Sequence, residues 1–191
     1  YGKDFLDKDF YNQGLNEAQK EAIYKCLGSQ DVSMIHGPPG TGKTTTVVEL
    51  ILQAVRLQKT KIMACAPSNI AVDNIIERLH VQNPKLKIVR IGHPARFLES
   101  VQKFCLDALI NGDHDYNSQT AGVRKDMNKM QLKLKKATTK AEKREIYDEF
   151  KLLRKDLRQI ERAHIDQIFK GADVICSTLT SAADKTLMGF V

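Results

Sequence analysis

The octapeptide GPPGTGKT, residues 37–44, restricts the fold of this chain more than any other feature. It satisfies the pattern G-x-x-x-x-G-K-[S/T] at every required position. An apolar run precedes it at residues 32–36, and residues 44–58 have the apolar spacing of a helix. In α/β domains, glycine-rich loops of this kind lie between a buried parallel strand and the helix that follows it. The octapeptide therefore predicts a strand, a loop and a helix in that order.

The same alternation continues along the chain. Further buried strands are predicted at residues 61–66, 87–91 and 173–177, and residues 70–79 have a helical pattern after the second strand. Strands that alternate with helices form a parallel sheet with crossover connections. The sequence therefore predicts an α/β fold in which helices flank a parallel sheet.

A long helical segment interrupts the alternation. Two stretches carry apolar residues at intervals of four and three, which predicts two helices with heptad stripes. The turn between them, ATTKAEKRE, places Thr139 and Glu142 as a capping box that opens the second helix. A short turn makes neighbours of the two helices, so we expect an inserted antiparallel helical hairpin. The stripes comprise Val123, Met127, Met130, Leu134 and Ala137, and then Ile146, Phe150, Leu153, Leu157, Ile160 and His164.

The loop itself has the chemistry of a nucleoside triphosphate site. Its glycines let the backbone turn tightly and present N–H groups to phosphate oxygens, and the next helix adds its amino-terminal dipole. We expect Lys43 to reach the β- and γ-phosphates of ATP and the Thr44 hydroxyl to ligate Mg²⁺, so these two residues are the catalytic candidates. The phosphate-binding residues expected in the loop are Gly37, Pro38, Pro39, Gly40, Thr41, Gly42, Lys43, Thr44 and Thr45.

Hydrolysis normally needs an acidic residue at the end of another buried strand, where it holds magnesium and orients water. None of the predicted strands ends in this way. The second runs into Pro67-Ser68-Asn69, the third into Gly92-His93 and the fourth into Ser177-Thr178. We therefore expect this chain to bind ATP but to hydrolyse it poorly on its own.

Two further stretches indicate which kind of ATPase this is. In GLNEAQKEAI, Gln19 lies eighteen residues before Gly37 on a predicted amphipathic helix. In CAPSNIAVDNIIERL, a buried strand stops at a small polar turn and a helix follows. Ser68 and Asn69, with free backbone N–H groups at the helix start, suit the phosphates of a nucleic-acid strand. Either side chain can instead cap the helix, and the two roles are compatible.

The order LNEAQ, GPPGTGKTTT, APSNIAVDNIIERL and RIGHPAR resembles the first motor domain of the up-frameshift-like superfamily 1B helicases, in particular their immunoglobulin-mu-binding type. The resemblance implies a RecA-like fold, with ATP in a cleft shared with a second RecA-like domain of the parent chain. It also implies that single-stranded DNA or RNA crosses both domains, with 5′ to 3′ polarity. Carried over by motif, Gln19 would contact adenine, Ser68 and Asn69 the strand backbone, and Thr178, in STLTSA, the strand as part of motif Ic.

Basic residues in two places leave alternatives open. In RIGHPAR, Arg90, His93 and Arg96 either contact phosphate or pack within the domain. The net charge of +7 lies in the helical segment, where residues 122–170 hold 15 of the 30 Lys and Arg against 8 of the 23 Asp and Glu. The lysines of the first helix and the turn form either a solvated face or a strand contact: Lys125, Lys129, Lys133, Lys136 and Lys140.

The expected organisation is a RecA-like domain in two parts around an insertion. The first part spans residues 1–97, the hairpin 98–168, and the continuation 169–191, which we expect to be cut before the acidic motif II. The chain begins without Met and has no apolar run of membrane-spanning length or leader segment, so we expect a piece of an intracellular protein, cytoplasmic, nuclear or both, without a membrane partner.

Two other classes of protein stay open at this point. An AAA+ remodelling ATPase shares residues 37–44. That class gives no reason for the stretch CAPSNIAVDNIIERL, which the resemblance identifies as motif Ia, or for the upstream Gln19. A nucleotide-gated nucleic-acid-binding module without hydrolysis would share all of these features.

Overall fold

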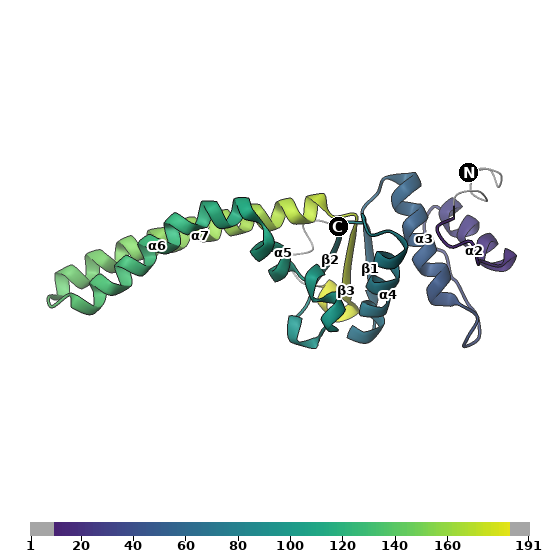
Figure 1. The fold of residues 1–191 in the computed structure, drawn as a ribbon, viewed down its shortest axis with the longest axis horizontal. Coiled ribbons are helices and arrows are strands. Elements are labelled where there is room, and N and C mark those ends of the chain that lie inside the picture. Colours follow the sequence, from purple (N-terminus) through teal and green to yellow (C-terminus); the bar gives the residue numbers. More distant parts are fainter. Residues whose placement is uncertain (1–9, 184–191) are drawn as a thin grey trace. The chain divides into compact units, whose positions relative to one another are not determined.

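The computed structural model describes residues 10–183, in two compact units (Figure 1). The first unit contains the described residues 10–105 and 171–183, and the second unit comprises Leu106–Lys170, which lies between them in the sequence. The outermost parts of the expected RecA-like domain, residues 1–9 and 184–191, lie outside the described residues.

The first unit is built on a parallel three-stranded sheet. Its strands are β1 (Ile62–Ala66), β2 (Ile88–Arg90) and β3 (Val174–Thr178), in the order β1-β3-β2. In the register, Ile62 pairs with Val174 at one end of β1 and Ala66 with Thr178 at the other. These are three of the four predicted strands, and the predicted α/β fold with a parallel sheet is confirmed. The connection from β2 to β3 contains the whole second unit.

The strand predicted at residues 32–36 is wrong. Residues 32–38 belong to no strand or helix, and Val32 and Met34 are 83% and 89% exposed. An apolar run becomes a buried strand only if other strands pair with it in the sheet, and the local sequence pattern does not specify those partner strands. Among the described residues, β1 pairs with β3 alone, so this run has no place in the observed sheet.

Helices cover the sheet as Figure 1 shows. α3 (Lys43–Gln58) and α4 (Asn69–Gln82) contact the strands and each other, and α2 (Glu17–Gly28) packs on α3. Two 3₁₀ turns, Pro94–Arg96 and Glu99–Phe104, follow β2, and the short α8 (Leu179–Ala182) follows β3. The core between helices and sheet includes Val48, Leu52, Val72, Ile76, Leu79, Ala64, Ile88, Val174 and Cys176.

A buried carboxylate on α3 holds the segment that leads into α2. The two oxygens of Glu49 accept hydrogen bonds from the backbone N–H groups of Tyr11 and Asn12, each at 3.0 Å. Gln53, also fully buried, donates to the same carboxylate at 2.8 Å. Glu49 therefore fixes the start of α2, and with it Gln19, against the helix that follows the glycine-rich loop.

Replacing Glu49 with alanine should lower the free energy of unfolding by about 3 kcal/mol, because it leaves two N–H groups without their acceptors and a cavity at a buried position. Chemical denaturation followed by circular dichroism measures the change. Glu21→Ala, an exposed carboxylate on α2, is the matched control and should change stability by less than about 0.5 kcal/mol. A loss of similar size in both variants would contradict the structural role of Glu49.

The second unit consists of helices. α5 (Leu106–Gly112) leads into α6 (His114–Lys136) and α7 (Lys140–Gly171), which are the two predicted long helices. The apolar stripes are half-buried along both, and His164 at the end of the second stripe stacks on Tyr116 of α6, with ring centroids 4.9 Å apart. The predicted capping box is present: the N–H groups of Thr139 and Glu142 each bond to the other's side chain at 3.3 Å. The bond from the Thr139 N–H lowers the pKa of Glu142.

None of the helices in residues 10–183 is both long and apolar enough to cross a membrane.

Candidate functional site

Two glycines of the loop have left-handed backbone conformations, and α3 begins directly after the second. Gly40 and Gly42 have φ values of 82° and 80°, a region that favours glycine. Gly42 is the N-cap residue of α3, and no side chain caps the helix. The first-turn N–H groups of α3 are therefore left to an external acceptor, which is the arrangement that binds phosphate at helix amino termini.

Two of the glycines also make room for neighbouring side chains. A Cβ atom on Gly37 would lie 2.7 Å from the Thr41 hydroxyl oxygen, and one on Gly42 would lie 2.5 Å from the Gln19 amide nitrogen. Both distances are too short for non-bonded atoms. A side chain at Gly37 would displace the Thr41 hydroxyl, and one at Gly42 would displace the Gln19 amide. Gly42 also has the positive φ that favours glycine.

Lys43 lies against the loop that it follows. Its ammonium group donates hydrogen bonds to the carbonyl oxygens of Gly37 and Pro38, at 2.6 and 2.8 Å. The Thr41 hydroxyl donates to the Pro38 carbonyl as well, at 2.8 Å. An ammonium group has three N–H donors, so these two bonds leave one for a phosphate oxygen.

The next two threonines differ in their surroundings. Thr44 is exposed, and its hydroxyl makes no hydrogen bond within residues 10–183. The Thr45 hydroxyl accepts a hydrogen bond of 3.2 Å from Arg78 of α4. Pro38 and Pro39 lie exposed at the turn of the loop. The uncapped helix start, Lys43 and the Thr44 hydroxyl together fit the triphosphate of ATP, with Thr44 as the residue that would ligate Mg²⁺.

Gln19 lies beside the loop, with both ends of its amide bonded. Its NH₂ group donates to the Thr41 carbonyl at 3.0 Å, and its oxygen accepts from the Asn16 N–H at 3.1 Å. Asn16 in turn accepts from the Gln19 N–H at 2.9 Å, which completes a capping box at the start of α2. We did not predict this box, although the spacing Asn-x-x-Gln before a helix is its sequence signal.

The residues expected to contact a nucleic-acid strand lie together at the carboxyl edge of the β-sheet. Ser68 follows β1 and Thr178 ends β3, and the register pairs Ala66 with Thr178 across the two strands. Both side chains are N-caps: Ser68 accepts from the Ala71 N–H at 3.2 Å, and Thr178 from the Ser181 N–H at 3.3 Å. The Ser68 hydroxyl keeps its own O–H for another acceptor, so its capping role leaves room for a phosphate contact. The Thr178 hydroxyl donates to the Ser181 side-chain oxygen at 3.0 Å and would have to exchange that bond to contact phosphate.

Arg90 packs inside the domain, which settles one of the alternatives left open by the sequence. Its side chain is 0% exposed and bonds to Asp73 of α4 at 3.0 Å. It also donates to the Asn69 side-chain oxygen at 2.8 Å and to the Ile91 carbonyl at 2.6 Å. The guanidinium carbon lies 4.3 Å from the ring centroid of Phe97. Arg90 therefore cannot face phosphate, whereas His93 and Arg96 are exposed.

This buried pair orients the strand-binding candidate Asn69. Because Arg90 occupies the oxygen of the Asn69 amide, the NH₂ group is the end left to donate to a ligand. The second oxygen of Asp73 accepts from the Leu98 N–H at 3.0 Å, so the pair also holds the segment after β2. Sequence reasoning missed this network, although a charged residue within an otherwise buried helix face and another at the end of a buried strand were its signal.

The parallel sheet and the glycine-rich loop at the start of α3 define a RecA-like P-loop nucleotide-binding domain. The sequence profile of a family described as "AAA domain" matches residues 14–190. The chain belongs to this family and, within it, to the up-frameshift-like superfamily 1B helicases.

Three relatives illustrate the match. The chain is 51% identical over 174 residues to "DNA-binding protein SMUBP-2" of Mesocricetus auratus, covering 91% of this chain and 17% of the relative. It is 39% identical over 183 residues to "DNA polymerase alpha-associated DNA helicase A" of Schizosaccharomyces pombe, covering 96% and 27%. It is 34% identical over 174 residues to the Drosophila melanogaster "Regulator of nonsense transcripts 1 homolog", covering 91% and 13%. The chain thus spans about a quarter or less of the length of these proteins.

Proposed function

We propose that this chain is the ATP-binding first motor domain of a nucleic-acid-dependent helicase that moves along single-stranded DNA or RNA, 5′ to 3′, and unwinds duplexes. The observation that carries the proposal is that the glycine-rich loop, which we call the ATP loop, adjoins α3, and that Ser68 and Asn69 lie at the start of the neighbouring helix α4. Together with Thr178, these two residues form the expected nucleic-acid contact, which we call the strand edge. Thr45 of α3, beside the loop, bonds to Arg78 of α4, and the amino terminus of α4 carries Ser68 and Asn69. A shift of the ATP loop can therefore reach the strand edge through α4.

The names of the relatives support this function. One is called a DNA-binding protein, another a DNA helicase, and a third, from Methanocaldococcus jannaschii, an ATP-dependent helicase. Since these relatives are several times longer than this chain, we propose that a second RecA-like domain of a longer parent protein completes the ATP cleft. The RecA-like domain of this chain would then be residues 1–97 and 169–191, with the hairpin inserted at 98–168, and the parent would act in the cytoplasm, the nucleus or both.

ATP would act by drawing the two motor domains together. Lys43 and the loop N–H groups would hold its β- and γ-phosphates, and Thr44 would hold Mg²⁺. Gln19 would contact adenine, for which it must exchange its present bond to the Thr41 carbonyl. Closure would change the grip of Ser68, Asn69 and Thr178 on strand phosphates, and hydrolysis would reverse that change.

The chain alone should hydrolyse ATP slowly. The observed strands β1, β2 and β3 end in Ala66, Arg90 and Thr178, so none of these three strands supplies a carboxylate at its carboxyl end. The acidic motif II would then be provided by the parent protein beyond Val191.

The double change Ser68→Ala and Asn69→Ala tests whether these residues bind single-stranded nucleic acid. Single-strand affinity should fall about tenfold, equivalent to about 1.4 kcal/mol, through loss of one hydroxyl and one amide donor, while ATP affinity stays unchanged. Fluorescence anisotropy with a labelled oligonucleotide measures the first, and titration calorimetry measures the second.

Loss of the Ser68 cap also costs about 1 kcal/mol of stability, so both affinities are measured below the unfolding transition. The matched control is Ser118→Ala with Asn128→Ala, two exposed positions on α6. Unaltered strand binding in the Ser68 and Asn69 variant would show that motif Ia does not hold the strand.

A further inference from the structure

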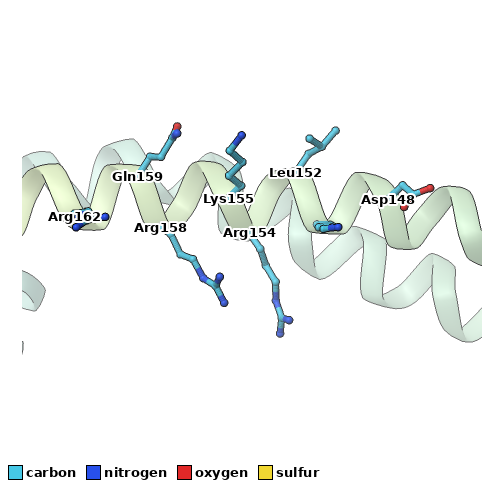
Figure 2. Close-up of a pocket in the computed structure, with 8 residues that line it drawn as sticks. Asp148, Leu152, Arg154, Lys155, Arg158, Gln159 and Arg162 are labelled. Atoms are coloured by element: carbon cyan, nitrogen blue, oxygen red, sulfur yellow. The ribbon is translucent and has the colours of Figure 1, made fainter.

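One face of α7 concentrates positive charge (Figure 2). Five exposed basic side chains lie within residues 151–162, at successive intervals of three, one, three and four. At 100° per residue they fall within an arc of about 100°. All residues that border this face belong to α7, so it is an open helical surface. The face consists of Lys151, Arg154, Lys155, Arg158 and Arg162, and we call it the α7 basic face.

Neighbouring carboxylates offset the positive charge of this face only in part, since its five basic residues have three flanking acidic residues on α7. Three acidic residues of α7 flank the arc: Asp148 lies three residues before Lys151, Glu161 three after Arg158, and Asp166 four after Arg162. None of the five basic side chains forms an ion pair within residues 10–183. The guanidinium group of Arg154 lies over the ring of Phe150, 4.9 Å from its centroid, and this contact leaves the charge uncompensated. The half-buried apolar stripe occupies the other side of the helix, at Leu153, Leu157 and Ile160.

This arrangement opposes helix stability. The five residues form five pairs of like charge at spacings of three or four, each of which destabilises an exposed helix by a few tenths of a kcal/mol. A face that served only for solubility would be more stable with acidic residues interspersed, as elsewhere on α7. The charge pattern instead suits a polyanion, which removes the repulsion when it binds.

The side chains and their spacing point to phosphate. Three of the five are arginines, whose planar guanidinium groups bind phosphate oxygens in pairs. Residues 151–162 rise about 16 Å along the helix, enough to meet several successive phosphates of one strand. Tyr147 lies one turn before Lys151 and is 63% exposed. An aromatic ring beside basic residues offers a surface on which a base can stack, which favours a single strand over an acidic peptide.

We propose that the α7 basic face binds the phosphate backbone of single-stranded nucleic acid, as a contact additional to the Ser68, Asn69 and Thr178 edge of the other unit. Binding here is electrostatic and independent of sequence, and it requires no ATP. The face adds affinity that depends steeply on salt concentration.

The test compares two charge-matched variants of the full chain, with a labelled single-stranded oligonucleotide titrated between 50 and 200 mM salt. Glutamine replaces lysine or arginine, since it keeps helix propensity while removing charge. One variant changes Arg154, Lys155, Arg158 and Arg162 on the α7 basic face, and the control changes Lys125, Lys133, Lys135 and Lys136 on α6. Circular dichroism verifies that both retain the helix content of the unaltered chain.

In the α7 variant, affinity at the lower salt concentration should fall at least tenfold. The slope of log affinity against log salt should decrease by about 3, because each single-strand phosphate contact contributes about 0.7. The α6 control should lose less than threefold. Equal losses in the two variants would mean that net charge alone attracts the strand, and no loss in the α7 variant would mean a solvated face; either result overturns the proposal.

An acidic peptide of equal charge distinguishes the other class of partner. If poly-glutamate binds as tightly as the oligonucleotide, and the α7 variant loses that binding, the face binds an acidic protein and the proposal is wrong. The Ser68 and Asn69 variant separates this inference from the proposed function. Strand affinity that depends on α7 but not on Ser68 and Asn69 would refute only the motif Ia contact, and the reverse would refute only the α7 contact.

Discussion

Replacing Lys43 with alanine is expected to weaken ATP binding by at least a hundredfold while leaving the fold intact. The ammonium group lies in the loop, bonded to the carbonyls of Gly37 and Pro38, with one donor left for phosphate. A hundredfold loss corresponds to about 2.7 kcal/mol, which is within the range of a hydrogen bond to a charged group combined with charge attraction. The two carbonyls that lose their donor are at or near the surface, so the free energy of unfolding should fall by less than about 1 kcal/mol.

Titration calorimetry with Mg²⁺ and ATP measures the affinity, and denaturation in urea measures the stability. Lys25→Ala removes the same charge from an exposed position on α2, where Lys25 forms an ion pair with the exposed Glu21, and serves as the control. ATP affinity in that control should be unchanged. If the Lys43 variant also keeps its affinity, ATP does not bind at this loop.

The second large effect is expected at Arg90. Arg90→Met should lower the free energy of unfolding by about 3–5 kcal/mol, because it leaves the carboxylate of Asp73 buried without its partner. Single-strand affinity should fall as well, since Asn69 loses the bond that orients its amide. Denaturation in urea and anisotropy with a labelled strand measure the two effects.

A double-mutant cycle separates the ion pair from simple loss of packing. Asp73→Asn keeps an acceptor for the Leu98 N–H but removes the charge. The double variant Asp73→Asn with Arg90→Met should therefore lose less unfolding free energy than the sum of the losses in the two single variants. The coupling free energy should be about 1–3 kcal/mol. Losses of unfolding free energy that simply add would contradict the role of the pair. Arg96→Met, at an exposed position in the same segment, is the control and should change stability little.

Much of the fold follows from short-range pattern. The heptad stripes from Val123 to Ala137 and from Ile146 to His164 predicted α6 and α7, since an apolar face repeats at the helical period whatever the helix packs against. The apolar runs at 61–66, 87–91 and 173–177 predicted the three observed strands. The run at 32–36 did not form a strand, because strand formation depends on partners that are distant in the sequence and pattern does not specify them.

The candidate site shows the same division. The glycine-rich loop is specified by local backbone geometry, so its sequence predicted the turn from Gly37 into α3. The bonds from Gln19 to Thr41 and from Arg90 to Asn69 and Asp73 join segments 17 to 22 residues apart. A single sequence shows that these polar side chains are present but does not show which of them meet once the chain has folded.

The central claim, that ATP binding in this domain serves movement along a strand, is tested most directly by ATP turnover of the proposed parent protein. Turnover is measured with single-stranded RNA, with single-stranded DNA and with neither, and the Lys43→Ala variant gives the background rate. We expect strong stimulation by at least one of the two polymers and none in the variant. Turnover indifferent to both polymers would contradict the account in favour of an AAA+ remodelling ATPase. Absence of turnover under all three conditions would contradict it in favour of a nucleotide-gated binding module.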